Sequence, residues 1–252
     1  MFEIILLSII QGLTEFIPVS SSSHLFIISE YINFHNQSLS IDVSLHIGSF
    51  IAVIVFFHKE IKNFTRNKGL FLKIFVSSIP VMLFGFFLVQ SSLIEKLRNI
   101  ELIGWMTIIF GILLYISDKF KIKKNLQQNF NYKSALFIGL FQILSLIPGV
   151  SRSGITITAA RFLNFNRFDS SKISFLLSIP TLGAVSIFGL TNLLLIENFD
   201  FTKANIIAIL LSFIFSYLTI KYFLKFVQKF NMNLFVIYRL ILGSILIYLS
   251  YL

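Results

Sequence analysis

Cysteine is absent from the 252-residue chain, so neither disulfides nor thiolate metal sites can contribute to it. Charged residues are scarce as well: they make up 13% of the chain, against 56% hydrophobic residues that include 31 phenylalanines. Soluble domains carry roughly a quarter charged residues, and the smaller share here leaves too little polar surface to cover a water-soluble globule. Lipid must therefore be the solvent for much of this surface.

The N-terminus lacks both a basic region and a small-residue cleavage site, since it reads MFEIILLSII. We therefore expect it to belong to the mature protein and not to a secretory signal. The formal net charge of +10 would suit a nucleic-acid partner. However, the lysines cluster in short connections between apolar runs, a pattern that the positive-inside rule explains better, and we expect no nucleic-acid partner.

Six apolar runs have about the length that a helix needs to cross roughly 30 Å of hydrocarbon. They cover residues 43–57, 70–89, 102–116, 173–195, 204–223 and 234–252. Basic residues gather in the connections 58–73, 118–133 and 221–229, whereas 91–101 and 197–203 are neutral or slightly acidic. This alternation predicts that the basic connections are cytoplasmic and the other two lie outside.

Two further apolar segments, 1–34 and 134–165, are each interrupted near the middle. Pro18 is followed by Val19 and four serines, and Pro148 is followed by Gly149 and a Val-Ser-Arg-Ser stretch. Such residues end a helix. The alternation of basic and non-basic connections also requires each segment to begin and end on the same side of the membrane. We predict two re-entrant helix–loop–helix hairpins, whose irregular backbone is buried in protein or lines a wet cavity.

The two hairpins resemble each other at an offset of 131 residues, which lays Val19-Ser20 on Val150-Ser151 and residues 31–34 on 162–165. The predicted fold class is an all-α polytopic membrane protein with two inverted-topology repeats. Each repeat consists of one re-entrant helix–loop–helix hairpin and three transmembrane helices. A single membrane domain, 1–252, then contains repeat one (about 1–117), a basic cytoplasmic loop (118–133) and repeat two (about 134–252). A polar site is expected where the two broken hairpins meet.

The first hairpin contains an ionisable residue at membrane depth. Gln11 and Glu15 are four residues apart and so share one helix face. A membrane-embedded Glu is costly and is a functional candidate by default, although an interfacial Glu capped by serines is the structural alternative. A single His such as His24 is more often structural. Beside Glu15 and four hydroxyls it becomes a candidate general acid/base or nucleophile.

The second hairpin supplies the complementary charge. Ser151, Arg152, Ser153 and Thr156 stand where a new helix should begin, and the free N–H groups and dipole of a helix start favour an anion. The planar fork of Arg152 suits phosphate oxygens. The structural alternative is an Arg152 that snorkels or balances Glu15. Because a charge pair this deep is costly and returns little stability, function is the better explanation.

The stretches QGLTEFIPVSSSSH and PGVSRSGIT resemble the two signature motifs of the undecaprenyl-pyrophosphate phosphatase family of the bacitracin-resistance type. The resemblance covers essentially the whole chain, including DVSLHIGS at 42–49. The positions that match the family pattern are Gln11, Glu15, Pro18, Ser20, Ser21, His24, Pro148, Gly149, Ser151, Arg152, Ser153 and Thr156. The chain departs from it at Ser23, usually Gly in the family, which should stiffen the turn before His24. Gln11 leaves one carboxylate instead of two, which disfavours mechanisms that need a carboxylate pair.

The resemblance implies hydrolysis of undecaprenyl diphosphate to the monophosphate and inorganic phosphate. This reaction recycles the lipid carrier for peptidoglycan synthesis and confers bacitracin resistance. It implies a multi-pass protein of the bacterial cell (inner) membrane whose active site faces the outer side. The expected partners are this lipid substrate and membrane lipids, and a homodimer is left open.

Residue roles follow from the same resemblance. The candidate catalytic residues are Glu15, Ser21, His24 and Arg152. The candidate substrate-binding residues are Gln11, Ser20, Ser22, Gly149, Ser151, Ser153 and Thr156. Glu15 is also a candidate ligand for a divalent cation, Mg²⁺ or Ca²⁺, since hard cations prefer carboxylates; no organic cofactor is expected.

Two questions stay open at this level. The nucleophile is Ser21 activated by Glu15 or His24, His24 itself, or an activated water. A lipid flippase or anion transporter is the alternative function, because inverted repeats with broken helices are a transporter architecture. A transport site for an anion has no need of an acid/base pair, and the presence of Glu15 and His24 therefore favours the enzyme.

Overall fold

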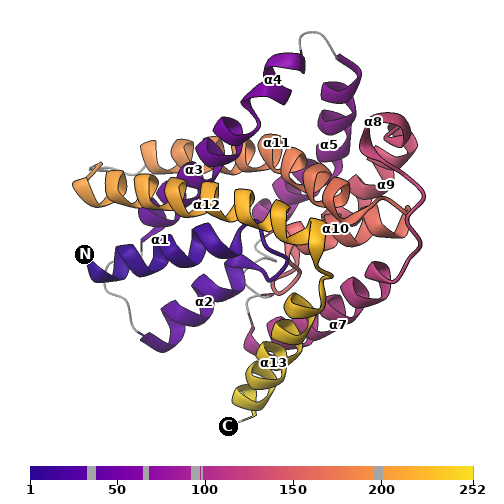
Figure 1. Cartoon of the computed structure of the whole chain (residues 1–252). Helices are drawn as coiled ribbons and strands as arrows, with labels where there is room; N and C mark the ends of the chain where they lie inside the picture. The colour runs from indigo at the N-terminus through magenta and orange to yellow at the C-terminus, as the bar shows by residue number, and fades with distance from the viewer. Residues whose placement is uncertain (33–37, 65–67, 92–96, 98, 196–200, 252) are drawn as a thin grey trace.

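The computed structural model describes residues 1–32, 38–64, 68–91, 97, 99–195 and 201–251, and this part of the chain is helical throughout its regular elements (Figure 1). Six helices are long and apolar enough to cross a membrane, which confirms the six predicted spans. They are α3 (Leu39–Phe56), α5 (Lys68–Gln90), α7 (Ile100–Asp118), α11 (Arg167–Leu194), α12 (Lys203–Lys229) and α13 (Asn233–Ser250).

Each predicted hairpin is a pair of shorter helices separated by a break at the expected proline. The first pair is α1 (Phe2–Thr14) and α2 (Ser21–Ile32). The second pair is α9 (Tyr132–Ile143), extended by the 3₁₀ turn η1 (Leu144–Leu146), and α10 (Arg152–Phe162). Two short helices, α4 (His58–Phe64) and α8 (Leu126–Asn129), lie in the basic connections.

Gly149 shows why the second break needs its glycine. Its φ of +91° lies in the left-handed region, and a Cβ there would stand 2.6 Å from the Ile103 carbonyl oxygen. The next helix, α10, begins three residues later at Arg152, because the side chain of its N-cap residue Ser151 accepts a hydrogen bond from the Gly154 N–H. The pattern Pro-Gly-x-Ser therefore sets where α10 starts.

The helices pack in pairs that join distant parts of the chain: α3 along α12, α13 along α7, α1 on α12 and α9 on α5 (Figure 1). Small residues bring the backbones together, as where Gly48 of α3 meets Ile209 of α12 and Gly139 of α9 meets Ser77 of α5. Such contacts are typical of membrane helices, since lipid supplies no hydrophobic force between them.

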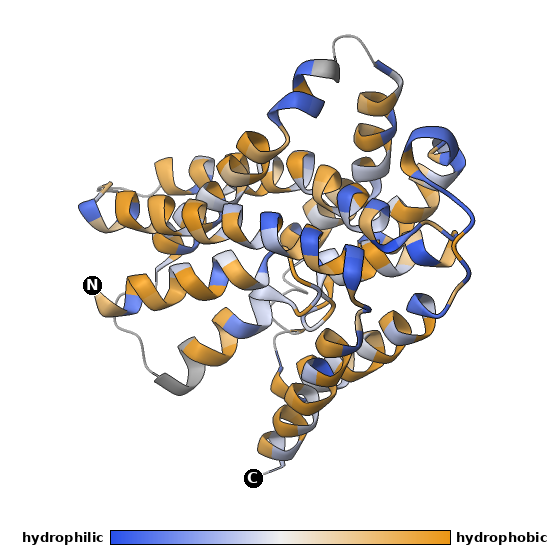
Figure 2. Ribbon diagram, viewed as in Figure 1, coloured by the Kyte–Doolittle hydropathy of each residue, from blue (hydrophilic) through white to orange (hydrophobic). Residues whose placement is uncertain are grey.

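The long helices consist mainly of hydrophobic residues, and hydrophilic residues concentrate toward the helix ends and the connections (Figure 2). Large side chains are exposed along these helices, for example Phe87, Ile187 and Leu210. An apolar surface this extensive would associate in water. The structure is therefore that of a polytopic membrane protein.

The three basic connections meet at one end of the bundle. Lys73 Nζ donates to the Phe130 carbonyl at 2.7 Å, and Asp118 accepts from the Met232 N–H at 3.2 Å and from Arg167 at 2.7 Å. These contacts place the three basic connections together, as the predicted alternation of basic and non-basic connections requires. Parts of the other connections, and part of the 31–34 repeat match, lie at 33–37, 92–96, 98 and 196–200, outside the described residues.

Candidate active site

Glu15 is the centre of the polar cluster between the two hairpins. It is the first residue after α1, it is buried, and its carboxylate accepts three hydrogen bonds. Gln11 Nε2 donates at 3.1 Å and Ser21 Oγ at 2.7 Å to Oε2, and Arg152 Nη2 donates at 3.0 Å to Oε1. Oε1 of the carboxylate thus forms an ion pair with Arg152, and Oε2 faces the Ser21 hydroxyl.

Arg152 brings the second hairpin to the same point. It is the first residue of α10, and it is separated from Glu15 by 137 positions in the chain. A second bond joins the two breaks, because Ser153 Oγ donates to the Ile17 carbonyl at 2.8 Å. The polar site predicted where the broken hairpins meet is therefore present in the fold.

Ser20 has a strained backbone next to the Ser21 hydroxyl. Its φ of +79° is unusual for a residue with a side chain, and such strain persists only where the surroundings hold it. The Ser20 hydroxyl is 2.8 Å from that of Ser23. Ser23, the departure from the family pattern, thus holds the Ser20 turn that precedes His24 through its hydroxyl.

The cluster opens into a pocket of about 210 Å³ near the middles of α5 and α11. Its walls carry polar groups from both hairpins together with apolar residues of α5 and α11. The lining residues that bear polar side chains are Thr14, Glu15, Ser20, Ser21, Ser22, His46, Ser145, Ser151, Arg152 and Thr181. Hydroxyls, one carboxylate, one guanidinium and one imidazole therefore surround this space.

Four residues predicted to bind substrate lie outside this lining and hold its walls instead. Gln11 orients Glu15, Gly149 shapes the break, Ser153 bonds to Ile17, and Thr156 Oγ1 donates to Ser174 Oγ at 2.7 Å. Gln11 Nε2, Ser153 Oγ and Thr156 Oγ1 thus donate to groups of the protein, whereas the buried Gln11 Oε1 has no hydrogen-bond partner in the part of the chain that the structure describes.

His24 is also placed away from the pocket, contrary to the expectation that it acts beside Glu15. Its Nδ1 is 2.6 Å from the Ser20 carbonyl and its Nε2 is 2.6 Å from the Tyr238 hydroxyl of α13. The two rings stack with centroids 5.7 Å apart. To exchange a proton with substrate, His24 would have to break one of these bonds, so the geometry favours a supporting role.

His46 takes the position that His24 was expected to hold. It lies on α3 and lines the pocket, and its Nδ1 is 2.8 Å from the Asp42 carbonyl one turn earlier. Nε2 is on the opposite side of the ring and is the nitrogen left to meet a ligand. A His inside an apolar span is a signal for such a position, but the spacing of the two hairpin motifs does not point to it.

The chain matches the profile of the family described as bacitracin resistance protein BacA over residues 4–245. It belongs to this family. Similar curated relatives are each named undecaprenyl-diphosphatase. The relative from Pelagibacter ubique is 49% identical over 99% of this chain and 97% of its own length. That from Saccharophagus degradans is 41% identical over 95% and 94%, and that from Ruegeria sp. is 35% identical over 100% and 99%.

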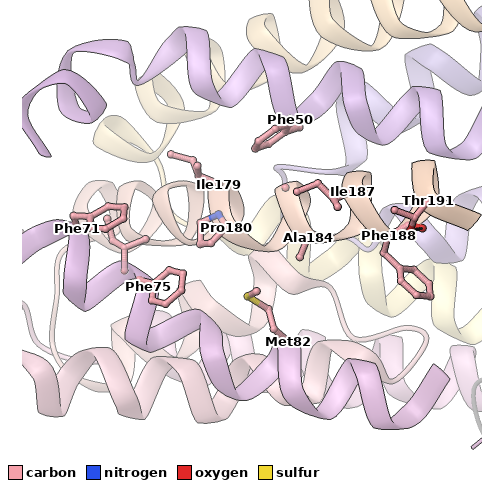
Figure 3. Close-up of a pocket in the computed structure, with 12 residues that line it drawn as sticks. Phe50, Phe71, Phe75, Met82, Ile179, Pro180, Ala184, Ile187, Phe188 and Thr191 are labelled. Atoms are coloured by element: carbon pink, nitrogen blue, oxygen red, sulfur yellow. Dashed lines mark hydrogen bonds between the residues drawn. The ribbon is translucent and has the colours of Figure 1, made fainter. Parts of the chain in front are cut away.

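An apolar cavity of about 650 Å³ adjoins the polar pocket of this family member, between α3, α5 and α11 (Figure 3). Successive residues face the two spaces: Val81 and Leu182 line the polar pocket, and Met82 and Gly183 line the apolar cavity. Thr191 is the polar residue of a lining otherwise made of apolar residues such as Phe50 and Ala184. A ligand in the pocket therefore has apolar space beside it.

The side chains of the pocket can bind a metal ion only together with the phosphates of a substrate. Within the described residues no group of three or more His, Cys, Asp or Glu could hold a metal ion, and Glu15 is the carboxylate of the pocket. A dedicated all-protein cage does not fit this set. Mg²⁺, however, is commonly held by one or two carboxylates together with substrate phosphates, and Glu15 fits that form.

Proposed function

We propose that the chain hydrolyses undecaprenyl diphosphate to undecaprenyl phosphate and inorganic phosphate. One observation carries the proposal: Ser21 Oγ lies 2.7 Å from a carboxylate whose other oxygen is 3.0 Å from Arg152. A hydroxyl, a base and a phosphate-binding guanidinium are the parts of a phosphoryl-transfer site. Membership of the family and the printed name of the relatives support the same substrate. This activity recycles the lipid carrier for peptidoglycan synthesis and confers bacitracin resistance.

In the first step, Glu15 accepts the proton of Ser21 as Oγ attacks the terminal phosphorus. The bond from that phosphorus to the bridging oxygen breaks, and undecaprenyl phosphate leaves with the electron pair. Arg152 and the N–H groups at the start of α10 neutralise charge on the phosphate oxygens. His46 Nε2 is placed to hydrogen-bond to the same group. The product of this step is phosphoserine at Ser21.

Glu15 passes the proton that it took from Ser21 to the departing undecaprenyl phosphate and is a carboxylate again. In the second step, water attacks the phosphoserine and Glu15 takes a proton from that water. The bond from phosphorus to Oγ breaks, Glu15 returns the proton to Ser21 Oγ, and inorganic phosphate leaves. The carboxylate needs one accepting oxygen for both steps, and Oε2 is the oxygen on the Ser21 side. When a divalent cation is bound, Glu15 and the substrate phosphates would hold it, and it would supply further charge neutralisation.

The apolar cavity takes the first part of the prenyl chain. The polar pocket, at about 210 Å³, is smaller than the roughly 300–1,000 Å³ of sites that enclose whole small-molecule ligands, so it accommodates the head group alone. The neighbouring cavity, at about 650 Å³, is open and apolar. Neighbouring residues of α5 and α11 line the two spaces, and this closeness supports a substrate that is part diphosphate and part lipid.

The inverted repeat is also part of the proposal. At the offset of 131 residues, Ser21 at the start of α2 falls on Arg152 at the start of α10. The helix pairings support the repeat too: α1 packs on α12, while its counterpart α9 packs on α5, the counterpart of α12. The repeats are about 1–117 and 134–252, joined by the cytoplasmic loop 118–133. The hairpins dip into the membrane from opposite faces, and the site opens to the outer side.

Trapping of the phosphoenzyme tests the proposal. Purified protein in detergent is mixed with substrate labelled at the terminal phosphate, quenched in acid and examined by peptide mass spectrometry. We expect phosphate release and a phosphorylated peptide containing Ser21, and neither in Ser21→Ala. A wild-type protein that releases no phosphate would contradict the phosphatase proposal and leave the transporter as the alternative. Release with no phosphoenzyme and an active Ser21→Ala would instead assign the attack to water.

A further inference from the structure

Arg239 is a buried cation that the proposed reaction does not use. It lies midway along α13, its exposed fraction is 0%, and it is not among the residues that line the polar pocket. Within the described part of the chain no carboxylate lies at ion-pair distance from it. A guanidinium without a counter-ion at membrane depth is expensive, and such residues mark function or its support.

The guanidinium of Arg239 binds both hairpin breaks at once. Nη1 donates to the Pro18 carbonyl at 3.2 Å and Nη2 to the Gly149 carbonyl at 3.0 Å. Nε donates to the Thr107 carbonyl of α7 at 3.1 Å. Pro18 lies between Glu15 and Ser21, and Gly149 lies three residues before Arg152. The fork therefore connects the segment with the base and the nucleophile to the segment with the phosphate-binding Arg.

The surroundings are shaped for this side chain. A Cβ at Gly111 of α7 would be 3.1 Å from Arg239 Cβ, and a Cβ at Gly154 of α10 would be 3.3 Å from Nη1. Carbonyls in irregular backbone have no helical partner and must find one inside a membrane protein. Arg239 supplies donors to two such carbonyls at fixed spacing, which single-point donors on separate helices could not do.

Resting on the proposed function, we propose that Arg239 is a positioning residue for the active site. It holds the Pro18 and Gly149 breaks at the separation at which the Glu15 carboxylate meets both Ser21 and Arg152. Removal of the fork lets the two breaks shift against each other. A misplacement of about 1 Å costs on the order of a hundredfold in rate, and the loss falls on catalysis more than on binding, because the phosphate-binding groups remain.

Arg161 provides a matched control. It is also a buried arginine that donates to three backbone carbonyls, those of Phe165, Asp118 and Phe120, but it does so at the end of the bundle where the basic connections meet. Arg161→Met removes a buried guanidinium that also binds backbone carbonyls, although Asp118 lies 3.6 Å from it, and it touches neither hairpin break. We expect it to lower the unfolding temperature and to leave kcat of the folded protein unchanged.

The experiment compares kcat, KM and thermal unfolding of Arg239→Met, Arg239→Lys and Arg161→Met in detergent. In Arg239→Met we expect kcat to fall roughly a hundredfold with KM little changed. Arg239→Lys keeps the charge but lacks the planar guanidinium, and its kcat should fall about tenfold. This variant keeps the test decisive if Arg239→Met fails to fold. A folded Arg239→Lys with wild-type kcat overturns the inference, as does equal loss of kcat in Arg161→Met. An inactive wild type would instead contradict the proposed function itself.

Discussion

Replacement of Glu15 by Gln tests the central group of the site with the smallest change of shape. The carboxylate has one oxygen on Arg152 and the other on Ser21, at 3.0 and 2.7 Å. An amide has one acceptor oxygen and one NH₂ group. It can therefore keep Arg152 or Ser21 as a donor but not both, and in neither orientation does Ser21 face a base.

The expected loss follows from this geometry. A positioned base contributes about 10²–10⁴-fold to such a step, so kcat of Glu15→Gln should fall at least roughly a hundredfold. Arg152 also loses its counter-ion. Because its side chain is 15% exposed toward the pocket, water can replace part of the interaction, and we expect a loss of about 1–3 kcal/mol in the free energy of unfolding.

The assay is phosphate release by purified protein in detergent, with thermal unfolding measured on the same samples. Glu60→Gln is the control, because Glu60 also forms an ion pair, at 2.7 Å with Lys172, but lies outside the pocket. We expect the control to keep wild-type kcat. A folded Glu15→Gln with the activity of the control would refute the assignment of Glu15 as base, whether or not the protein is a phosphatase.

Four further predictions follow from the same structure. Arg152→Lys should recover little activity relative to Arg152→Ala in phosphate release, since a point charge cannot hold the carboxylate and phosphate as a fork does; near-full activity would reduce Arg152 to charge balance. His24→Gln should lower kcat evenly across the pH range, because the ring supports the Ser20 turn; a lost limb of the pH profile would make it an acid or base. A cysteine at Lys62 should resist an impermeant thiol reagent applied outside whole cells while one at Lys203 reacts, and labelling of both from one side would contradict the inverted repeat. Ala184→Trp fills the apolar cavity and should raise KM for undecaprenyl diphosphate and for farnesyl diphosphate, whose chain corresponds to the part placed there, but not for inorganic diphosphate, which has no chain; an unchanged KM for both lipids would remove the prenyl chain from this cavity.

The six spans and the two broken hairpins could be predicted because lipid is a demanding solvent. A segment in hydrocarbon must satisfy its own backbone, so a long apolar run can only be a helix, and a Pro with small polar residues at its centre must be a break. The observed helices α3, α5, α7, α11, α12 and α13 all fall on the predicted runs. From the sequence, a pairing of Arg152 with Glu15 is the structural alternative to a functional role, and the structure contains this ion pair, since a buried charge needs a partner.

The positions of the histidines and the role of Arg239 depend on tertiary structure. His24 follows the serines directly in sequence, yet it turns to α13, while His46 reaches the pocket from α3. Which face of a helix meets the site is set by the packing of helices far apart in the chain, and local spacing carries no information about it. Arg239 stands out in sequence as a lone charge within an apolar run. Only the fold brings the Pro18 and Gly149 carbonyls to its two nitrogens, because those residues lie 221 and 90 positions away.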